Sequence, residues 1–115
     1  MQITEALQNL GLNEKEAKVY IALIQLGKAT AYSIATRSNL KKPTTYVVLE
    51  TLIDKGIVQK LPRAKKAVYV AIAPEELFAV AKSKIKNAEE EILPELKRVT
   101  SWTSRLSNKI FGGKR

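Results

Sequence analysis

The sequence predicts a mainly α-helical domain that ends in a β-hairpin and is followed by a long helical segment. Apolar residues recur at helical spacing through most of residues 1–56, and two β-rich runs of hairpin length follow them. The 115 residues, 45% of them hydrophobic, are enough for one compact domain with a core and one additional element.

Two helices are expected before residue 28. The first covers residues 3–10 and is stopped by Gly11. The second follows Asn13, a capping residue with Glu16 three positions later, which is the spacing of a capping box. Apolar residues cover so much of this second helix, which ends at Gly27, that we expect it at the centre of the domain.

Two short helices joined by a tight turn come next. The first runs from an N-cap at Thr30 to about Ser38, and Asn39 ends it. The second opens at Pro43, because proline at the first helical position loses no hydrogen bond, and it closes at Gly56. The residues of this helix that should face the core are Val48, Leu49, Leu52 and Ile53.

A β-hairpin completes the domain. Its strands are residues 57–61 and 67–72, joined by the basic loop 62–66. Lys28 and Ala29 could add a third short strand. Helix, turn, helix and hairpin in this order form a winged helix-turn-helix, in which the second helix is the recognition helix and the hairpin is the wing. We expect this domain to cover residues 1–73.

Residues 74–111 have a different pattern, with good helix formers as far as Leu93 and apolar residues seven positions apart. The expected seam consists of Phe78, Ile85, Ile92, Leu96, Val99 and Leu106. Pro94 should either bend this helix or divide it in two, because a proline inside a helix costs about 3 kcal/mol. We expect residues 112–115 to be a disordered tail.

The seam has two explanations. It could fold back onto the winged domain, or it could pair with the same segment of a second chain. The stripe is longer than a domain of about 70 residues usually needs, and a lone amphipathic helix would leave a large apolar patch in water. We therefore predict that residues 74–111 are a dimerisation segment and that the protein is a homodimer.

The net charge of +9 is concentrated on the predicted helix-turn-helix and wing. Residues 37–66 contain eight basic and two acidic residues, so two thirds of the excess lies there. Such a cluster is typical of surfaces that neutralise phosphates. A basic surface that serves only solubility is the alternative.

The candidate DNA contacts lie at the start of the recognition helix and on the wing. Side chains that could reach the major groove are Lys41, Lys42, Thr44, Thr45, Tyr46 and Val47. The wing residues expected on phosphates or in the minor groove are Arg63, Lys65 and Lys66. Ser33 and Arg37 would add backbone contacts. Tyr46 could instead be a core aromatic, because Leu49 and Ile53 follow it at helical spacing.

The residue types exclude several classes of function. Without cysteine or histidine, the chain can form no disulfide, Cys/His zinc site, thiol nucleophile or histidine general base. We expect no enzyme activity, no metal and no cofactor. No apolar run approaches the roughly 20 residues that span a bilayer, and the first residues lack a signal peptide pattern. We therefore expect a cytoplasmic, nucleoid-associated protein with no membrane partner.

Several short motifs lie between residues 10 and 77. They are Leu10-Gly11-Leu12, Glu16-Ala17-Lys18-Val19-Tyr20, Leu26-Gly27, Tyr46 with Leu49-Glu50, Lys55-Gly56-Ile57-Val58 and Pro74-Glu75-Glu76-Leu77. Together they resemble the N-terminal DNA-binding domain of the TrmB family of archaeal and bacterial transcription regulators. The resemblance implies a winged helix-turn-helix regulator that binds double-stranded DNA.

The sequence also departs from that family. Where the family commonly has an arginine and an aspartate near the start of the recognition helix, this sequence has Thr44 and Val47. The DNA sequence read by better-known members is therefore not carried over. The 115 residues contain no counterpart of the long C-terminal sugar-binding domain, and the sequence gives no evidence of a small-molecule effector.

The fold class is compatible with three functions. We favour a sequence-specific transcription regulator that binds double-stranded DNA as a homodimer. A protein-interaction or assembly module is the second, and a non-specific chromatin- or RNA-binding protein is the third. The basic wing favours nucleic acid over protein, and the mixed polar and apolar recognition helix favours base reading over packaging.

Overall fold

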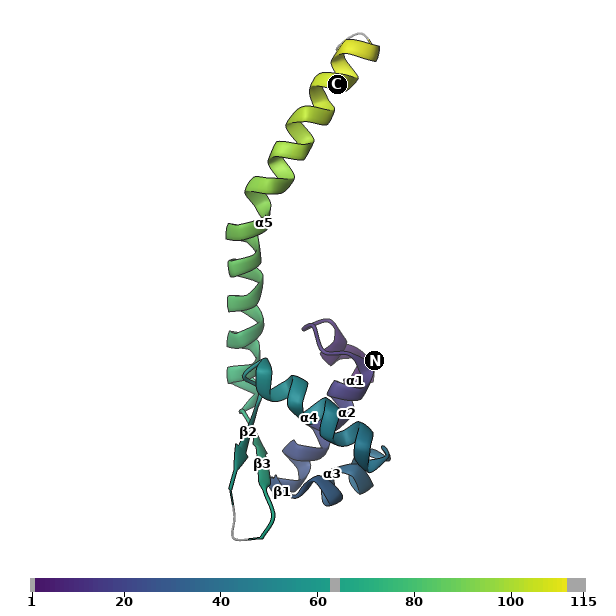
Figure 1. Cartoon of the computed structure of the whole chain (residues 1–115), viewed down its shortest axis with the longest axis vertical. Coiled ribbons are helices and arrows are strands. Elements are labelled where there is room, and N and C mark those ends of the chain that lie inside the picture. Colours follow the sequence, from purple (N-terminus) through teal and green to yellow (C-terminus); the bar gives the residue numbers. More distant parts are fainter. Residues whose placement is uncertain (1, 63–64, 112–115) are drawn as a thin grey trace. The chain divides into compact units, whose positions relative to one another are not determined.

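The computed structural model describes residues 2–62 and 65–111, with the backbone alone for residues 102–111. Within these residues the elements are α1 (Ile3–Gln8), α2 (Glu14–Leu26), β1 (Lys28–Ala29), α3 (Ala31–Ser38), α4 (Lys42–Asp54), β2 (Val58–Leu61), β3 (Val68–Ala71) and α5 (Pro74–Phe111) (Figure 1). This order confirms the predicted fold class, a mainly helical winged helix-turn-helix followed by a long helix. The chain divides into two compact units, with the division between Ala81 and Lys82.

Local signals in the sequence set the helix boundaries. The Asn13 side chain accepts a hydrogen bond from the Glu16 N–H at 2.8 Å, and the Asn13 N–H donates to Glu16 Oε1 at 2.9 Å. This is the predicted capping box at the start of α2. Thr30 caps α3, and Asn39 ends it with a φ of 59°, a left-handed conformation that asparagine adopts more easily than most residues. Helix α4 begins at Lys42, one residue before the predicted Pro43.

The three strands form an antiparallel sheet in the order β1-β3-β2. Strand β2 pairs with β3 from Val58 opposite Ala71 to Leu61 opposite Val68. On the other side of β3, the two residues of β1 pair with Val70 and Tyr69. The short third strand that Lys28 and Ala29 could form is therefore present, and it ties the start of α3 to the hairpin.

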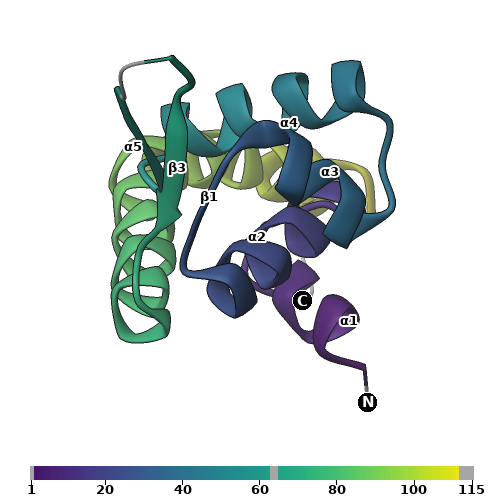
Figure 2. The same cartoon turned by 90° about the horizontal axis from the view of Figure 1, so that it is seen from below.

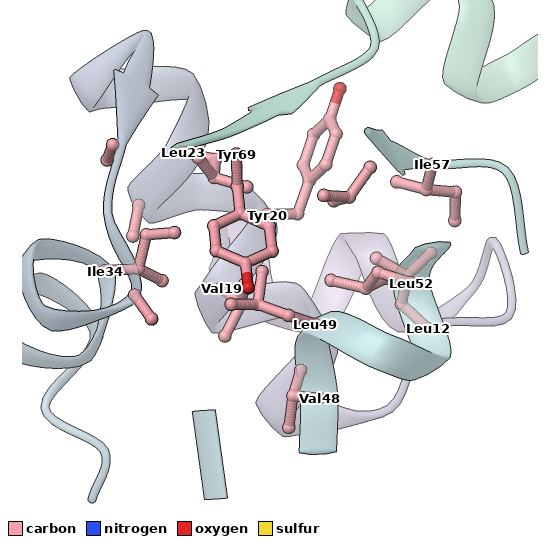
Figure 3. Close-up of a cluster of buried hydrophobic side chains, with 14 of the residues drawn as sticks. Leu12, Val19, Tyr20, Leu23, Ile34, Val48, Leu49, Leu52, Ile57 and Tyr69 are labelled. Carbon is pink, nitrogen blue, oxygen red and sulfur yellow. The ribbon is translucent and has the colours of Figure 1, made fainter. Parts of the chain in front are cut away.

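Helix α2 is the central helix of the winged unit, as predicted. It packs against α1, α3, α4 and the sheet (Figure 2). The largest side chains that are less than 2% exposed include Val19, Leu23, Ile34, Leu49 and Leu52 (Figure 3). The Tyr20 ring is also buried, and its hydroxyl donates to the Ile72 carbonyl oxygen at 2.9 Å, so burial leaves no polar atom of this ring unpaired.

The first two turns of α5 complete the core of the winged unit. Leu77 is 2% exposed and Ala81 is 8% exposed. The Ala73 N–H donates to Glu76 Oε1 at 3.2 Å, which fixes the start of the helix. The first compact unit extends to Ala81, eight residues beyond the boundary expected from the sequence, because Leu77 belongs to the buried core and Val80 packs against it.

The rest of α5 forms most of the second unit. The helix continues through Pro94, so the alternative of two separate helices is wrong. Its exposed apolar residues include Ile85, Ile92, Leu96 and Val99. The side chain of Leu106 and the expected tail at 112–115 lie outside the part of the chain that is described.

Candidate nucleic-acid interface

The start of α4 carries a solvent-exposed arc of mixed chemistry. Lys41 and Lys42 are exposed, and Thr44 is half-buried. Tyr46 is 47% exposed and Val47 is 64% exposed, although both lie in the helix that supplies much of the core. A tyrosine this exposed is not a core aromatic, so the alternative explanation for Tyr46 does not hold. The arc offers ammonium, hydroxyl and apolar groups side by side.

Thr45 does not belong to this arc. It has no exposed surface, and its hydroxyl donates to the Lys41 carbonyl oxygen at 3.0 Å. It precedes Val48, Leu49 and Leu52 by three, four and seven residues, so it shares their core-facing side of the helix. The prediction that Thr45 contacts DNA is therefore wrong, and its hydroxyl instead bonds back to the main chain of the first turn.

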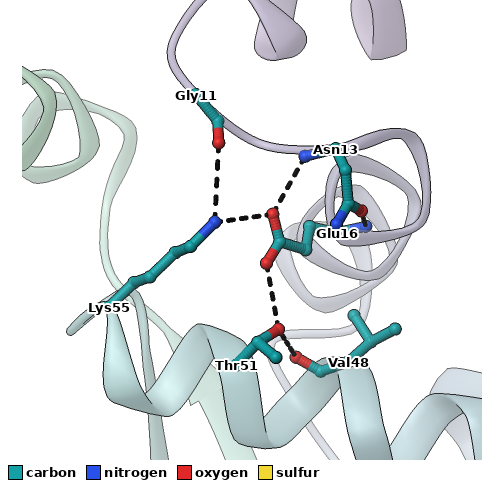
Figure 4. Close-up of polar contacts among 6 residues, drawn as sticks. All are labelled: Gly11, Asn13, Glu16, Val48, Thr51 and Lys55. Carbon is teal, nitrogen blue, oxygen red and sulfur yellow. Dashed lines mark hydrogen bonds and ion pairs between the residues drawn. The ribbon is translucent and has the colours of Figure 1, made fainter.

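A buried carboxylate holds α4 against α2 (Figure 4). Glu16 is 2% exposed, and its Oε1 accepts from Lys55 Nζ at 2.9 Å in addition to the capping-box N–H of Asn13. The Thr51 hydroxyl lies 2.9 Å from Glu16 Oε2 and 2.7 Å from the Val48 carbonyl oxygen, so its single hydrogen is shared between them. The sequence alone predicts only the capping-box contact of Glu16. Its contacts with Thr51 and Lys55 could not be predicted, because these residues lie far along the chain.

The ionisation of Glu16 follows from these contacts. Burial raises the pKa of its carboxyl group, but the hydrogen bonds from Lys55, Asn13 and Thr51, with the charge of Lys55, outweigh burial and lower the pKa from its ordinary value of 4.5. The group is therefore a carboxylate at neutral pH, and it fixes the position of the recognition helix on the domain.

The wing lies beside the recognition helix. Lys65 and Lys66 are exposed where the loop returns to β3, and Arg63, the third predicted wing contact, lies outside the described residues. Tyr69 of β3 is buried, and this burial raises its pKa, with further contributions from the nearby Tyr46 and Glu50. Since both of those residues belong to α4, the middle strand of the sheet lies next to the exposed arc.

A hollow of about 290 Å³ separates the wing from the starts of α3 and α4. Among the described residues that line it are four lysines, Lys42, Lys60, Lys65 and Lys66. Hydroxyl groups come from Thr30, Tyr32, Tyr46 and Tyr69. We call this feature the lysine hollow. Lys42 Nζ lies 5.8 Å from the centroid of the Tyr32 ring, within the range of a cation–π contact.

Tyr32 and Lys60 were not among the residues predicted for the site. Lys60 counted only toward the basic charge of residues 37–66, and Tyr32 sits in the first turn of α3, where no pattern in the sequence relates it to the wing. Their shared position depends on the pairing of β2 with β3 and of β3 with β1. Tyr32 is 64% exposed, which makes it accessible to a ligand.

A second hollow, of about 410 Å³, lies on the other side of the exposed arc. It is lined by Asn13, Glu14, Lys15, Thr44, Val47, Val48 and Thr51. Thr44 and Val47 therefore face the start of α2, whereas Lys42 and Tyr46 face the wing. Residues that are close in sequence on α4 thus border two different hollows.

The two DNA contacts predicted on α3, Ser33 and Arg37, have different side-chain neighbours. Ser33 is exposed near the Thr30 cap, and the two side-chain oxygens lie 3.4 Å apart. Arg37 is exposed, and its Nε donates to Gln25 Oε1 at 2.9 Å, which holds the guanidinium against α2. Both lie on the surface of the helix that precedes the recognition helix.

Two other kinds of site are absent from residues 2–62 and 65–111. No helix in these ranges has the length and the apolar character needed to cross a membrane. The same ranges contain no group of three or more carboxylates that could hold a metal ion.

Comparison with known proteins identifies the family of this chain. The sequence pattern of the family described as "Sugar-specific transcriptional regulator TrmB" matches residues 7–75. The chain is 34% identical over 86 residues to YrhO of Bacillus subtilis (strain 168), covering 75% of this chain and 30% of YrhO. It is 30% identical over 94 residues to MJ1082 of Methanocaldococcus jannaschii, covering 81% of this chain and 75% of MJ1082.

A solved structure gives the same relationship. The structure of TrmBL2, described as an archaeal chromatin protein that shows a novel mode of DNA binding, superposes with a TM-score of 0.79 at 26% identity. The match covers 98% of this chain and 43% of that one, so the chain spans less than half the length of TrmBL2, as it does of YrhO. The chain belongs to the TrmB family of transcriptional regulators, a family of DNA-binding winged helix proteins.

Proposed function

We propose that this protein is a sequence-specific transcription regulator that binds double-stranded DNA as a homodimer. The observation that carries the proposal is the exposed arc at the start of α4, where Thr44, Tyr46 and Val47 lie between two hollows and beside the lysines of the wing. Surfaces built for phosphate attraction alone need only cations, whereas base reading needs hydroxyl and apolar groups as well.

In this proposal the arc enters the major groove. A helix of this size fits that groove, and side chains in its first turns reach the base edges. Lys41 can donate to guanine, the Thr44 hydroxyl can bond with bases or phosphates, and the methyl groups of Val47 match a thymine methyl. The Glu16 contacts to Thr51 and Lys55 hold the second half of α4, so the arc is presented on a fixed helix.

The wing supplies affinity. Lys65 and Lys66 are exposed, and each phosphate that they neutralise releases counterions from the duplex. Arg63 is the third proposed wing contact, and its inclusion rests on the sequence alone. Contacts of this kind attract any duplex, so they strengthen binding without selecting a sequence. A protein that works in this way acts where the DNA is, in the cytoplasm at the nucleoid.

The proposal of a homodimer rests on the exposed apolar side chains of α5 in the second unit. Ile85 is 68% exposed, Ile92 is 49% exposed and Leu96 is 56% exposed, at positions seven and four residues apart along one helix. Apolar side chains at this spacing form a stripe that a second copy of the same helix can cover, which removes the stripe from water. Two winged units in one dimer would then read two half-sites.

The experiment that tests the proposal separates base reading from general attraction. A preferred site is first selected from random duplexes, and binding to it and to random duplex is then measured for Thr44→Ala and Tyr46→Ala. Because neither side chain is charged, we expect each variant to lose about 1 to 3 kcal/mol on the preferred site with little change on random duplex. Thr4→Ala, the same change on α1, is the control for Thr44→Ala.

Two results would contradict the proposal. One is that both variants bind the preferred site as tightly as the parent. The other is that no preferred site can be selected although duplex DNA is bound. The second result would favour non-specific, chromatin-type binding, which the likeness to TrmBL2 and the net charge of +9 make the second candidate function.

A further inference from the structure

The lysine hollow concentrates positive charge where the fold does not require it. Lys42 comes from α4, Lys60 from β2, and Lys65 and Lys66 from the loop, so three separate segments bring ammonium groups to one place. The described lining contains no carboxylate to balance them. Like charges brought together repel one another, and a bound anion is the arrangement that relieves this repulsion.

The other groups in the hollow fit a phosphate in particular. Thr30 and Tyr32 contribute hydroxyls, which can donate to phosphate oxygens alongside the ammonium groups. The volume of about 290 Å³ is far larger than the space of roughly 30 Å³ that one water occupies, and it lies just below the usual range of small-molecule pockets. A phosphate with its adjoining sugar is of this scale.

Tyr32 has a separate role. Lys42 follows the turn between α3 and α4, where a long side chain has many rotamers available. The Tyr32 ring, with its centroid 5.8 Å from Lys42 Nζ, favours the rotamers that keep the ammonium group near α3 and over the hollow. Tyr32 is therefore a positioning residue for Lys42 and also lines the hollow itself.

We propose that the lysine hollow is a phosphate-binding site that holds one backbone phosphate of the DNA, with Lys42 and Lys60 as its cationic contacts and Tyr32 positioning Lys42. The inference rests on the proposed function, because it names the part of the DNA that this site takes. It assigns Lys42 to the backbone and leaves base reading to Lys41, Thr44, Tyr46 and Val47. A single phosphate bound in the lysine hollow would fix the position of the exposed arc along the major groove.

The first test counts phosphates. The salt dependence of binding to random duplex is measured for Lys42→Gln, Lys60→Gln, the double variant and Lys86→Gln, an exposed lysine of α5 that does not line the hollow. If both lysines share one phosphate, each single variant lowers the slope by less than one unit and the double variant lowers it by only about one. We expect Lys86→Gln to behave as the parent. Circular dichroism verifies that each variant is folded.

Two outcomes of this test overturn the proposal while DNA binding itself stands. An unchanged slope in the double variant means that Lys42 and Lys60 do not hold a phosphate of the DNA. A slope lower by about two units means that Lys42 and Lys60 neutralise two different phosphates and do not share a site.

The second test concerns Tyr32. Tyr32→Phe keeps the ring, whereas Tyr32→Leu keeps an apolar side chain without one. We expect Tyr32→Leu to bind duplex about two- to five-fold more weakly, the size of an exposed cation–π contact, and Tyr32→Phe to restore most of the loss. In a Lys42→Gln background the two variants should bind equally. A difference that persists in this background would contradict the positioning role.

A third test does not depend on DNA. Inorganic phosphate is titrated into the parent and into the double lysine variant, and backbone amide chemical shifts are followed by NMR. Saturable shifts at Thr30, Tyr32 and Lys60 that disappear in the double variant support the site. If the parent binds no duplex at all, the proposed function fails, and such shifts would then indicate free phosphate as the ligand. Their absence in that case would overturn the site as well.

Discussion

Replacing Glu16 by glutamine tests how the recognition helix is held. The carboxylate is 2% exposed and accepts from Lys55, the Asn13 N–H and Thr51. Hydrogen bonds to a charged group contribute about 1.5–3 kcal/mol and neutral ones about 0.5–1.5, so each of the three bonds should weaken by about 1 kcal/mol. Glutamine also turns one acceptor oxygen into a donor. Since the Lys55 side chain is 32% exposed and can regain water, we expect a loss of about 2–3 kcal/mol in unfolding free energy at neutral pH.

Urea unfolding followed by circular dichroism measures this loss. Glu14→Gln is the matched control, because Glu14 lies two residues away on the same helix, with its side chain 68% exposed and 3.6 Å from Lys18. A surface pair at this spacing contributes about 0.5 kcal/mol or less, so the control should be close to the parent.

The difference in unfolding free energy between the parent and Glu16→Gln should also depend on pH, and the pKa of Glu16 sets the direction of this dependence. The pKa of Glu16 in the folded protein lies below its ordinary value of 4.5, so the charged group stabilises the fold above pH 4.5. This stabilisation is lost as the pH falls through the folded pKa, and the gap between parent and Glu16→Gln should close over that range. A gap of less than about 0.5 kcal/mol at neutral pH, or one that does not change with acid, would refute this account of Glu16.

Three further predictions concern assembly, the wing and the core. The parent should sediment as a dimer at micromolar concentration, and the Ile85→Asp, Ile92→Asp double variant should be a monomer with a folded winged unit; a stable parent monomer would contradict the proposed dimer. The Lys65→Ala, Lys66→Ala variant should weaken binding to all duplexes alike and lower the salt slope by about one unit for each phosphate that is no longer neutralised, whereas an unchanged slope would remove the wing from the DNA. Leu52→Ala should lower the unfolding free energy by about 2–5 kcal/mol in a urea titration, because Leu52 has no exposed surface. A loss below about 1 kcal/mol would show that neighbouring side chains fill the cavity that the substitution leaves.

Most of the fold could be predicted from local patterns. The capping box at Asn13, the Thr30 cap and the Asn39 stop act within a few residues of chain, and the structure has each of them. Thr45 could also have been placed correctly, because its spacing to Val48 and Leu49 is that of a core position. Its position in the first turn of the recognition helix favours a groove contact, but this spacing places it in the core.

The remaining features depend on residues far apart in sequence. Glu16 meets Thr51 and Lys55 across 35 and 39 positions, and no pattern in one sequence relates them. Tyr32 and Lys60 share a hollow only because strand pairing brings their segments together. The burial of Leu77 has the same cause, since its spacing within a long amphipathic helix fits a core position and a dimer seam equally well.

The edges of the small sheet have a consequence for crowding on DNA. Strand β1 has two residues and β2 has four, and β2, the longer edge, carries the exposed Lys60. Short edges with a lysine resist the addition of a strand from another molecule, which is a common route to aggregation. In the proposed DNA complex, copies bound close together along one duplex would thereby be kept from joining through their wings. Lys60 would then serve solubility as well as the proposed phosphate binding, and the Lys60→Gln variant should aggregate more readily than the parent at high concentration.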